Sequence, residues 1–396
     1  MEASNNARRV VGELLSELVA DLRAGESAAP KTRIGLMASG SELVRDGDAG
    51  QRELTDGALA AMAADSSLEV VMIGPKKINT APENLSWIET NDCEADISEG
   101  MNQALASGDI AGAVALHYPF PLGVATIGRV VTPFHGKPML VASTTGTSST
   151  DRVEAMVKNA ICGQAAARAI GIQSPTVGIL NIDGAPSVSR ILGKLRDAGY
   201  DIRFGESVRK DGGSLLRGND LLAGAVDVCV TDTLTGNILM KLFSSWNNGG
   251  SYEAVGFGYG PSTGEGWDKI VSIISRASGA PVIANALLYT AMSARGSLAR
   301  RVSDEFAAAK RAGLADMLEG ARAQSAPRKE AVPPPTEPTG EEIHGVDVLS
   351  IDDATKALWE KGVYAEAAMG CTGPVVKVPG HARDKAKEIL ASLGYI

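Results

Sequence analysis

The sequence predicts an α/β protein with a mostly parallel, doubly wound sheet, followed by a small α+β module at the C-terminus. Short apolar segments alternate with helical segments through most of the chain, which is typical of strands covered on both faces. Aromatic residues make up only 4% of the chain, and 45 of the 396 residues are glycine. This composition favours close packing of helices on a sheet over a β-sandwich.

The body is expected to span residues 31–324, after an amphipathic helix over residues 1–30. The expected strands, in chain order, are Thr32–Gly40, Leu68–Pro75, Ile110–Tyr118, Lys137–Gly146, Thr176–Gly184 and Val226–Asp232. Helices are expected over Ile97–Gly108 and Asp151–Ile172, and from Thr235 onward. In a parallel sheet, ligands bind beyond the carboxyl ends of the strands, so the site is sought there.

A proline-rich segment over residues 325–342 predicts an extended linker between the body and the C-terminal module. Residues 343–396 then predict a strand, a helix, two strands and a second helix. The first of these helices starts near Asp352 and stops at Gly362. Because the segment is short for an independent domain, we expect it to dock on the body or to move on its tether.

The charge pattern and the cysteines narrow the class of protein. The net charge is −9 without any basic run, so we expect no nucleic-acid partner. No apolar stretch approaches about 18 residues and the N-terminus lacks a signal-peptide pattern, so we expect a cytoplasmic protein with no membrane contact. The four cysteines, Cys93, Cys162, Cys229 and Cys371, are far apart in sequence, which predicts free thiols and no metal site.

The most informative stretch is VDVCVTDTLTGNILMK, from Val226 to Lys241. A buried strand ends at Asp232, and a helix that carries Lys241 follows. The free amides at the helix start suit a phosphate, and Gly236 allows close approach of the backbone. Thr235 and Asn237 add side-chain donors. An ordinary helix N-cap would give the same pattern, so the two interpretations stay open.

Two further loops follow expected strands. In ASTTGTSSTDR, the hydroxyls of Ser143, Thr144 and Thr145 and the charge of Arg152 could form an oxyanion site, although a solvated linker has similar composition. In NIDGAPSVSR, Ser187 and Arg190 stand near the mouth of a strand-to-helix turn, and a plain turn is the alternative.

Other candidate features are weaker. His117 and His135 lie in proline-rich loops, where a structural histidine is more common than a general base. The stretch VGFGYGPSTGEGWDK is rich in glycine but lacks a GxGxxG motif after a strand, so a dinucleotide site is not expected.

One cysteine stands in an unusual setting, the turn MGCTGPV near the C-terminus. A buried cysteine is usually a small apolar residue, but Gly370 and Gly373 flank Cys371 and let a ligand approach the backbone closely. The motif alone leaves both a packing role and a nucleophilic role open.

The stretch TDTLTGNILMK resembles the phosphate-binding region of the PlsX and phosphotransacetylase superfamily. GILNIDG is similar to that superfamily's Leu-Asn-Ile-Gly strand end, and GAPVIANAL takes the place of its late Pro-Val-Val-Ile strand. The resemblance implies an isocitrate/isopropylmalate-dehydrogenase-like fold. It also implies exchange of an acyl group between a thioester and inorganic phosphate.

Over nearly its full length, with YAEAAMGCTGPVVKV as the most specific part, the chain resembles the α subunit of component C of glycine/sarcosine/betaine reductase. The resemblance implies that Cys371 carries an acetyl thioester, which phosphate cleaves to acetyl phosphate. Inorganic phosphate would be a co-substrate, and neither a metal nor another cofactor is implied. The implied partners are a ketosynthase-III-like β subunit and an acyl donor protein, either a selenoprotein or a carrier, in a hetero-oligomer.

Three functions therefore compete. The first is acyl transfer from Cys371 to phosphate, with Asp232, Thr235, Gly236, Asn237 and Lys241 at the phosphate site. The second is an interaction subunit whose tail caps a partner's active site, for instance a ketosynthase-like protein of a biosynthetic pathway. The third is a PlsX-like acyltransferase that takes the acyl group directly from a carrier protein.

Overall fold

A computed structural model describes residues 30–38, 49–76, 85–134, 136–209, 212–250, 252–325, 331–347, 350–370 and 373–396. The helix predicted over residues 1–30 lies almost wholly outside these ranges, as do His135 and Cys371. The chain divides into two compact units, Met1–Leu318 and Glu319–Ile396, each considered separately below.

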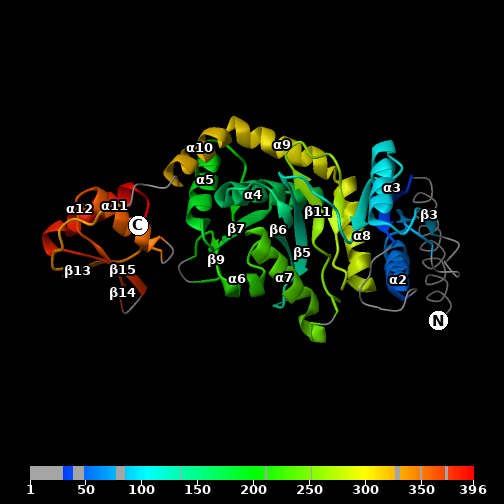
Figure 1. The fold of residues 1–396 in the computed structure, drawn as a ribbon, viewed down its shortest axis with the longest axis horizontal. Coiled ribbons are helices and arrows are strands. Elements are labelled where there is room, and N and C mark those ends of the chain that lie inside the picture. The colour runs from blue at the N-terminus through cyan, green and yellow to red at the C-terminus, as the bar shows by residue number, and fades with distance from the viewer. Residues whose placement is uncertain are drawn as a thin grey trace, which may run out of the picture. The chain divides into compact units, whose positions relative to one another are not determined.

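The first unit is built on a 12-stranded sheet (Figure 1). Its strands are β1 (Thr32–Met37), β2 (Leu68–Ile73), β3 (Ser86–Ile88), β4 (Gly112–Ala115), β5 (Val124–Val131), β6 (Pro138–Thr147), β7 (Thr176–Leu180), β8 (Arg203–Phe204), β9 (Leu215–Leu216), β10 (Val228–Val230), β11 (Gly260–Gly264) and β12 (Val271–Ile273). The order across the sheet is β3-β2-β1-β4-β12-β11-β5-β6-β10-β7-β8, with β9 paired to β7.

The helices that start in this unit are α2 (Ala49–Ala64), α3 (Glu94–Ser107), α4 (Arg152–Ala169), α5 (Ala185–Asp197), α6 (Gly218–Ala223), α7 (Thr233–Ser245), α8 (Ala280–Arg295), α9 (Leu298–Arg311) and α10 (Leu314–Ser325), with a 3-10 turn at Trp246–Asn248. Local signals explain several boundaries. Gly108 ends α3 in the left-handed region that favours glycine, and the Asp151 carboxylate caps α4 by accepting from the Glu154 amide.

The predicted mostly parallel sheet is confirmed, but its two halves run in opposite directions. Strands β3, β2, β1, β4 and β12 are mutually parallel, and so are β6, β10, β7 and β8. Antiparallel pairings of β12 with β11, β11 with β5, and β5 with β6 join the halves. The carboxyl ends of the two halves therefore lie at opposite edges of the sheet.

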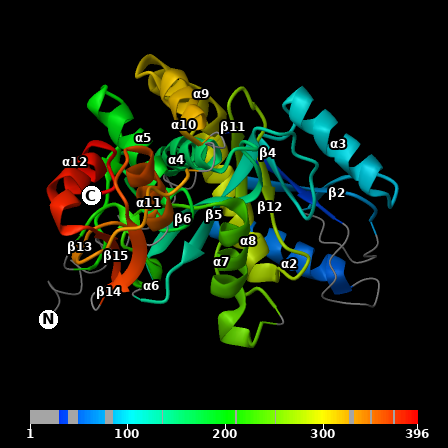
Figure 2. The same cartoon turned by 60° about the vertical axis from the view of Figure 1, so that its left-hand side comes forward.

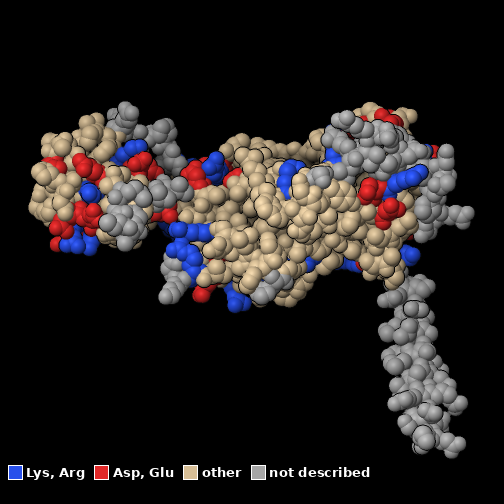
Figure 3. All heavy atoms as spheres, turned by 90° about the horizontal axis from the view of Figure 1, so that it is seen from below, with Lys and Arg blue, Asp and Glu red and all other residues tan. Residues whose placement is uncertain are grey.

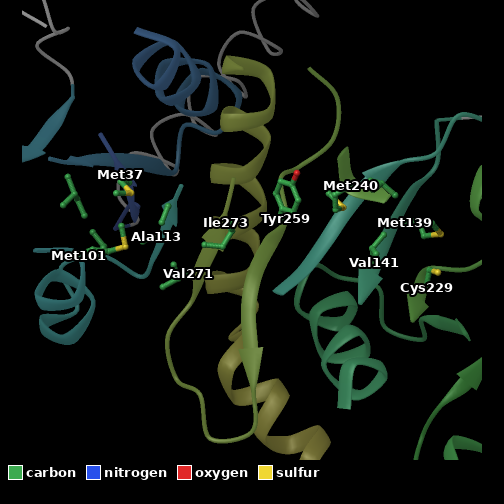
Figure 4. Packing of buried hydrophobic residues seen from close by; sticks show 14 of the residues in the cluster. Met37, Met101, Ala113, Met139, Val141, Cys229, Met240, Tyr259, Val271 and Ile273 are labelled. Carbon is green, nitrogen blue, oxygen red and sulfur yellow. The ribbon is translucent and has the colours of Figure 1, made fainter. Parts of the chain in front are cut away.

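Helices cover both faces of the sheet, as predicted. Figures 1 and 2 show α2 and α3 on opposite faces of the N-terminal half. Figure 1 shows α4 on one face of the other half and α7 on the opposite face. A buried apolar cluster runs through both halves (Figure 4), from Met37 and Met101 to Met139 and Cys229. Such two-sided burial explains why the strands are apolar throughout instead of alternating.

One predicted element is wrong. GAPVIANAL was expected to take the place of a late strand, and the structure forms α8 there instead. Pro281 lies in the first turn of this helix, where a missing amide hydrogen costs nothing, and small alanines follow. A short apolar run cannot distinguish a buried helix from a buried strand, which explains the error.

The second unit contains a small antiparallel sheet of order β13-β15-β14. Its elements are β13 (Glu341–Ile343), α11 (Ile351–Glu360), β14 (Glu366–Gly370), β15 (Gly373–Val378), a 3-10 turn at Gly380–Ala382 and α12 (Arg383–Ser392). They follow the order strand, helix, strand, strand, helix. Ile343, Leu358, Val376, Val378 and Leu390 belong to a buried cluster of this unit.

Candidate active site

Three neighbouring parallel strands end together at one edge of the sheet. Val230 of β10 is in register with Ala142 of β6 and Ile179 of β7. Polar residues come next along each strand: Ser143, Thr144 and Thr145 after Ala142, Thr231 and Asp232 after Val230, and Asn181 after Leu180. Three of the predicted loops therefore meet at this carboxyl edge, as the rule for parallel sheets requires.

The first turn of α7 faces this edge, but its amides are partly used within the protein. The Asp232 carboxylate accepts from the Thr235 amide at 3.0 Å and from the Thr235 hydroxyl at 2.7 Å. The Gly236 amide donates to the Asp232 carbonyl at 3.0 Å. The ordinary N-cap that the sequence left open is thus present. The amides that an N-cap of this kind leaves unbonded belong to Thr233 and Leu234.

The end of β6 is clamped against the start of α7. A β-carbon built on Gly236 would lie 1.8 Å from the Ser143 carbonyl oxygen, so only glycine allows this approach. The Asn237 amide donates to the Thr144 carbonyl at 3.1 Å, and the Thr233 hydroxyl donates to the Gly146 carbonyl at 3.1 Å. Gly236 and Asn237 therefore fix the strand end, a role that neither the phosphate site nor the ordinary N-cap considered in the sequence analysis had included.

A buried asparagine of α4, which the sequence analysis did not single out, connects the strand ends. The Asn159 side chain donates to the Ser143 hydroxyl at 3.3 Å and to the Thr231 carbonyl at 3.2 Å. It also accepts from the Ser148 hydroxyl. An amide next to the apolar run Ala160–Cys162 of α4 was the available signal, because a buried polar side chain normally has partners.

Lys241 lies one turn beyond Asn237, and the structure places it beside other side chains. Its ammonium donates to the Tyr259 hydroxyl at 3.1 Å, and that hydroxyl donates to the buried Glu253 carboxylate at 2.9 Å. Burial, together with the charge of Glu253, raises the pKa of Tyr259 above its ordinary value, so the phenol stays protonated. Thr144 donates to the Tyr259 carbonyl at 2.6 Å, which ties this group to β6.

The remaining predicted residues lie nearer the surface. Arg152, the first residue of α4, forms an exposed ion pair with Asp183 at 3.0 Å, which links the loops after β6 and β7. Arg190 donates to the Ser187 hydroxyl at 3.1 Å, one turn apart on α5. Thr145 accepts or donates a hydrogen bond with the Thr126 hydroxyl at 2.9 Å. His117 is exposed.

Two polar atoms at this edge are buried without a partner among the described residues: the Thr231 hydroxyl and the side-chain oxygen of Asn181. Thr231 is fully buried, and its methyl group faces the first turn of α7. Buried polar atoms without partners are uncommon in folded proteins and are often explained by a ligand or water. The sequence analysis had not selected either residue.

The thiols differ in their surroundings. Cys162 and Cys229 are free and buried, and burial raises the pKa of each to about 12, so neither supplies a thiolate near neutral pH. Cys93 is free and exposed. Cys371 lies outside the described residues; β14 and β15 on either side of it pair as far as Gly370 and Gly373.

Within the described ranges, no cluster of three His, Cys, Asp or Glu side chains is arranged to hold a metal ion. Likewise, none of the helices that the structure describes is long and apolar enough to cross a membrane.

A family model described as a fatty acid synthesis protein matches residues 44–377. The chain belongs to this family. Across 395 residues it is 45% identical to the glycine/sarcosine/betaine reductase complex component C subunit alpha of Peptoclostridium acidaminophilum. The alignment covers 99% of this chain and 100% of that subunit. The resemblance found in the sequence is thereby confirmed over nearly the full length of the chain.

Over parts of its length, the chain is also similar to phosphate acyltransferases. The enzyme of Thermotoga neapolitana is 27% identical over 230 residues, which is 50% of this chain and 66% of that one. The enzyme of Phenylobacterium zucineum is 34% identical over 113 residues, 27% of this chain and 30% of that one. These similarities confirm the expectation of an enzyme of the transferase class.

Among solved structures, a branched-chain phosphotransacylase from Enterococcus faecalis V583 aligns with a TM-score of 0.44 and 16% identity. The alignment covers 66% of this chain and 99% of that one.

Proposed function

We propose that the protein transfers an acetyl or related acyl group, held as a thioester on Cys371, to inorganic phosphate. A phosphate oxygen attacks the thioester carbonyl carbon, and the tetrahedral intermediate collapses as the carbon–sulfur bond breaks. The products are the acyl phosphate and the Cys371 thiolate, so the step balances without an oxidant, a metal or another cofactor. The similarity to both a reductase component C subunit and the phosphate acyltransferases supports this reaction.

The observation that carries the proposal is the convergence of polar groups at the carboxyl edge of β6, β10 and β7. The amides of Thr233 and Leu234 lie in the first turn of α7, the Ser143 hydroxyl bonds to the Thr233 hydroxyl at 2.8 Å, and the ends of β10 and β7 add the buried Thr231 hydroxyl and the Asn181 side chain, whose oxygen has no described partner. Amides and hydroxyls are the donors that bind an oxyanion, and a helix start adds a partial positive charge. Arg152, which pairs with Asp183 in the loop after β7, adds a positive charge on this side of the sheet.

The negative charge of Asp232 affects how phosphate would bind at this edge. Its carboxylate already caps α7, so it offsets part of the helix dipole. Phosphate would bind beside this carboxylate, and we infer that its protonated oxygen faces Asp232 while its charged oxygens face the amides. The side chain of Asn237 holds the Thr144 carbonyl, so its role in phosphate use is to keep the β6 end in place.

The reverse reaction gives a direct test, since acetyl phosphate should acetylate Cys371. Intact-mass and peptide mass spectrometry should find one acetyl group on this cysteine, which added phosphate or arsenate removes. Cys371→Ser should abolish both steps, whereas Cys93→Ser, the control at an exposed thiol, should leave them unchanged. Asn237→Ala should slow discharge by phosphate more than it slows removal of the acetyl group by hydroxylamine.

If Cys371→Ser retains acyl transfer to phosphate, the carrier role is wrong and a phosphate acyltransferase that acts on its donor directly replaces it. If phosphate changes neither labelling nor discharge, the chain is an interaction subunit. We also infer that, like a subunit of a reductase complex, it works in the cytoplasm with a partner subunit that resembles a ketosynthase and with an acyl donor protein.

A further inference from the structure

A buried asparagine of α4 joins three segments of the candidate active site. Asn159 is only 1% exposed. Its side-chain nitrogen donates to the Ser143 hydroxyl at 3.3 Å and to the Thr231 carbonyl at 3.2 Å, and its side-chain oxygen accepts from the Ser148 hydroxyl. These partners lie in β6, directly after β10 and in the loop that leads to α4. One side chain thus holds both strands that end beside the first turn of α7.

The partners of Asn159 fix the orientation of its side-chain amide. A carbonyl oxygen can only accept a hydrogen bond, so the group that faces the Thr231 carbonyl is the nitrogen. The oxygen is then the group that accepts from Ser148. A flipped amide would place its oxygen against the Thr231 carbonyl, with two acceptors facing each other. Asn159 therefore acts as a donor toward both strand ends.

The orientation of this amide also fixes the direction of two hydroxyl groups. The Ser143 hydroxyl lies 2.8 Å from the Thr233 hydroxyl, which donates to the Gly146 carbonyl at 3.1 Å. Each hydroxyl has one proton, so Thr233 accepts from Ser143, and Ser143 accepts from Asn159. We call this series of bonds, from Asn159 through the two hydroxyls to the Gly146 carbonyl, the Asn159 network. Since Thr233 is the first residue of α7, the network reaches the turn whose amides we propose bind phosphate.

Full charges are sparse around this turn. Lys241 is the only charged residue from Thr233 to Asn248, and its ammonium donates to the Tyr259 hydroxyl. Figure 3, which views the body from the side on which α7 lies, shows few charged side chains in the middle of that face. An anion would therefore be held mainly by amide and hydroxyl dipoles. Hydrogen bonds weaken steeply when their geometry is poor, so the placement of these groups decides the affinity.

We propose that Asn159 is a positioning residue for phosphate, an inference that rests on the proposed function. Through the Asn159 network it holds Thr233, whose amide would donate to phosphate. Through the Thr231 carbonyl it holds the residue whose buried hydroxyl has no described partner. Asn159 acts through these residues and not by contact with phosphate. Small displacements of positioned groups can cost a large part of an activity.

A second buried amide on α4 provides a matched control. Gln164 is fully buried, and its side chain donates to the Tyr200 hydroxyl, the Asp201 carbonyl and the Glu305 carboxylate. These partners lie in the segment after α5 and on α9, outside the loops of the candidate active site. Gln164→Ala therefore removes a buried, bonded amide from the same helix, as Asn159→Ala does, but it leaves the Asn159 network intact.

The first test follows the discharge of acetylated Cys371. Asn159→Ala should raise the KM for phosphate about tenfold, while hydroxylamine should remove the acetyl group at the natural rate. Gln164→Ala should lose stability in urea as well, but its KM for phosphate should equal that of the natural chain. The same KM in both variants would show that Asn159 is only structural and would overturn the proposal.

A smaller substitution tests the network itself. Ser143→Ala removes one hydroxyl, so it should fold even if Asn159→Ala does not, and it should also raise the KM for phosphate. The double variant should raise this KM by less than the product of the two single effects, because both changes break the same series of bonds. An unchanged KM in Ser143→Ala, or effects that multiply in the double variant, would overturn the proposal.

Phosphate binding separates this inference from the proposed function. The Cys371→Ser chain cannot carry an acetyl thioester, so calorimetry with inorganic phosphate measures binding alone. In this background, Asn159→Ala should weaken phosphate binding about tenfold and Gln164→Ala should not change it. If that result is found but phosphate does not discharge acetylated Cys371, the proposed function fails and the positioning role stands. If phosphate does not bind, or binds both variants equally, the positioning role is wrong.

Discussion

The two ends of the same three strands, β6, β10 and β7, differ in how their polar groups are satisfied. At the amino end, the Asp227 carboxylate accepts from the Thr176 amide at 2.9 Å and from its hydroxyl at 2.7 Å, and Lys137 lies 3.5 Å away. At the carboxyl end, Thr231 and Asn181 each keep a buried oxygen that has no partner in the described part of the chain.

This difference separates an end whose polar groups are satisfied from the end that we propose binds phosphate. A buried polar atom without a partner costs about 1–3 kcal/mol, so a fold that keeps two of them at one edge gives up stability there. The same strands show at their other end that the fold can satisfy such groups. We therefore expect substitutions at the carboxyl edge to change activity, and substitutions at the amino end to change stability alone.

The largest effect is expected at Gly236. Gly236→Ala places a β-carbon against the Ser143 carbonyl, and overpacking of this kind costs about 3 kcal/mol. Urea denaturation should show this loss, and acyl transfer to phosphate should fall below detection because the strand end moves. Gly193→Ala on α5, where a β-carbon meets nothing within 4 Å, is the matched control and should stabilise the protein slightly. Equal stability of the two variants would contradict the tight contact.

The second-largest effect is expected at Asp227, at the amino end of the three strands. The pKa of Asp227 is lowered, because burial, which alone would raise it, is outweighed by the hydrogen bonds from Thr176 and the charge of Lys137. Asp227→Asn should therefore cost about 1.5 kcal/mol at neutral pH, with activity of the folded protein unchanged.

Because the pKa of Asp227 is lowered in the folded state, the stability difference between the natural chain and Asp227→Asn depends on pH. A carboxyl whose pKa is lower in the folded state stabilises the protein above its unfolded pKa, and this contribution is lost as the pH falls through the folded value. The gap in Tm between the natural chain and Asp227→Asn should thus narrow on acidification. A gap that widens toward acidic pH would show that another group controls it.

The smallest effect on stability is expected at Asn181. Asn181→Ala removes a buried oxygen that has no described partner, and the gain from removing it is offset by the packing contacts that the shorter side chain loses, so the free energy of unfolding should change by less than about 0.5 kcal/mol. If this atom faces bound phosphate through water or directly, the KM for phosphate should rise about tenfold. A clear loss of stability without any change in KM would place Asn181 with the structural residues and weaken the comparison of the two ends.

Much of the body followed from local pattern. Leu68–Ile73 and Thr176–Leu180 were identifiable as buried strands, Gly108 as a helix stop, and Asp232 as the residue between a strand and a helix. These features depend on hydrophobic runs and on backbone preferences of a few adjacent residues. The strands β5 and β11 were missed, because Gly128 and Arg129 interrupt the apolar residues of β5, and the sequence of β11, GPSTG, has no apolar run.

By itself, the sequence determined that strands and helices alternate, that three polar loops follow strands which end at one edge, and that a glycine-flanked cysteine stands in the C-terminal module. Only the tertiary structure decided that the two halves of the sheet run in opposite directions, that Asp232 consumes helix amides expected to be free, and that Asn159 joins the strand ends. The reason is distance along the chain: Asn159 meets Thr231 across 72 residues, and no local preference encodes such a contact.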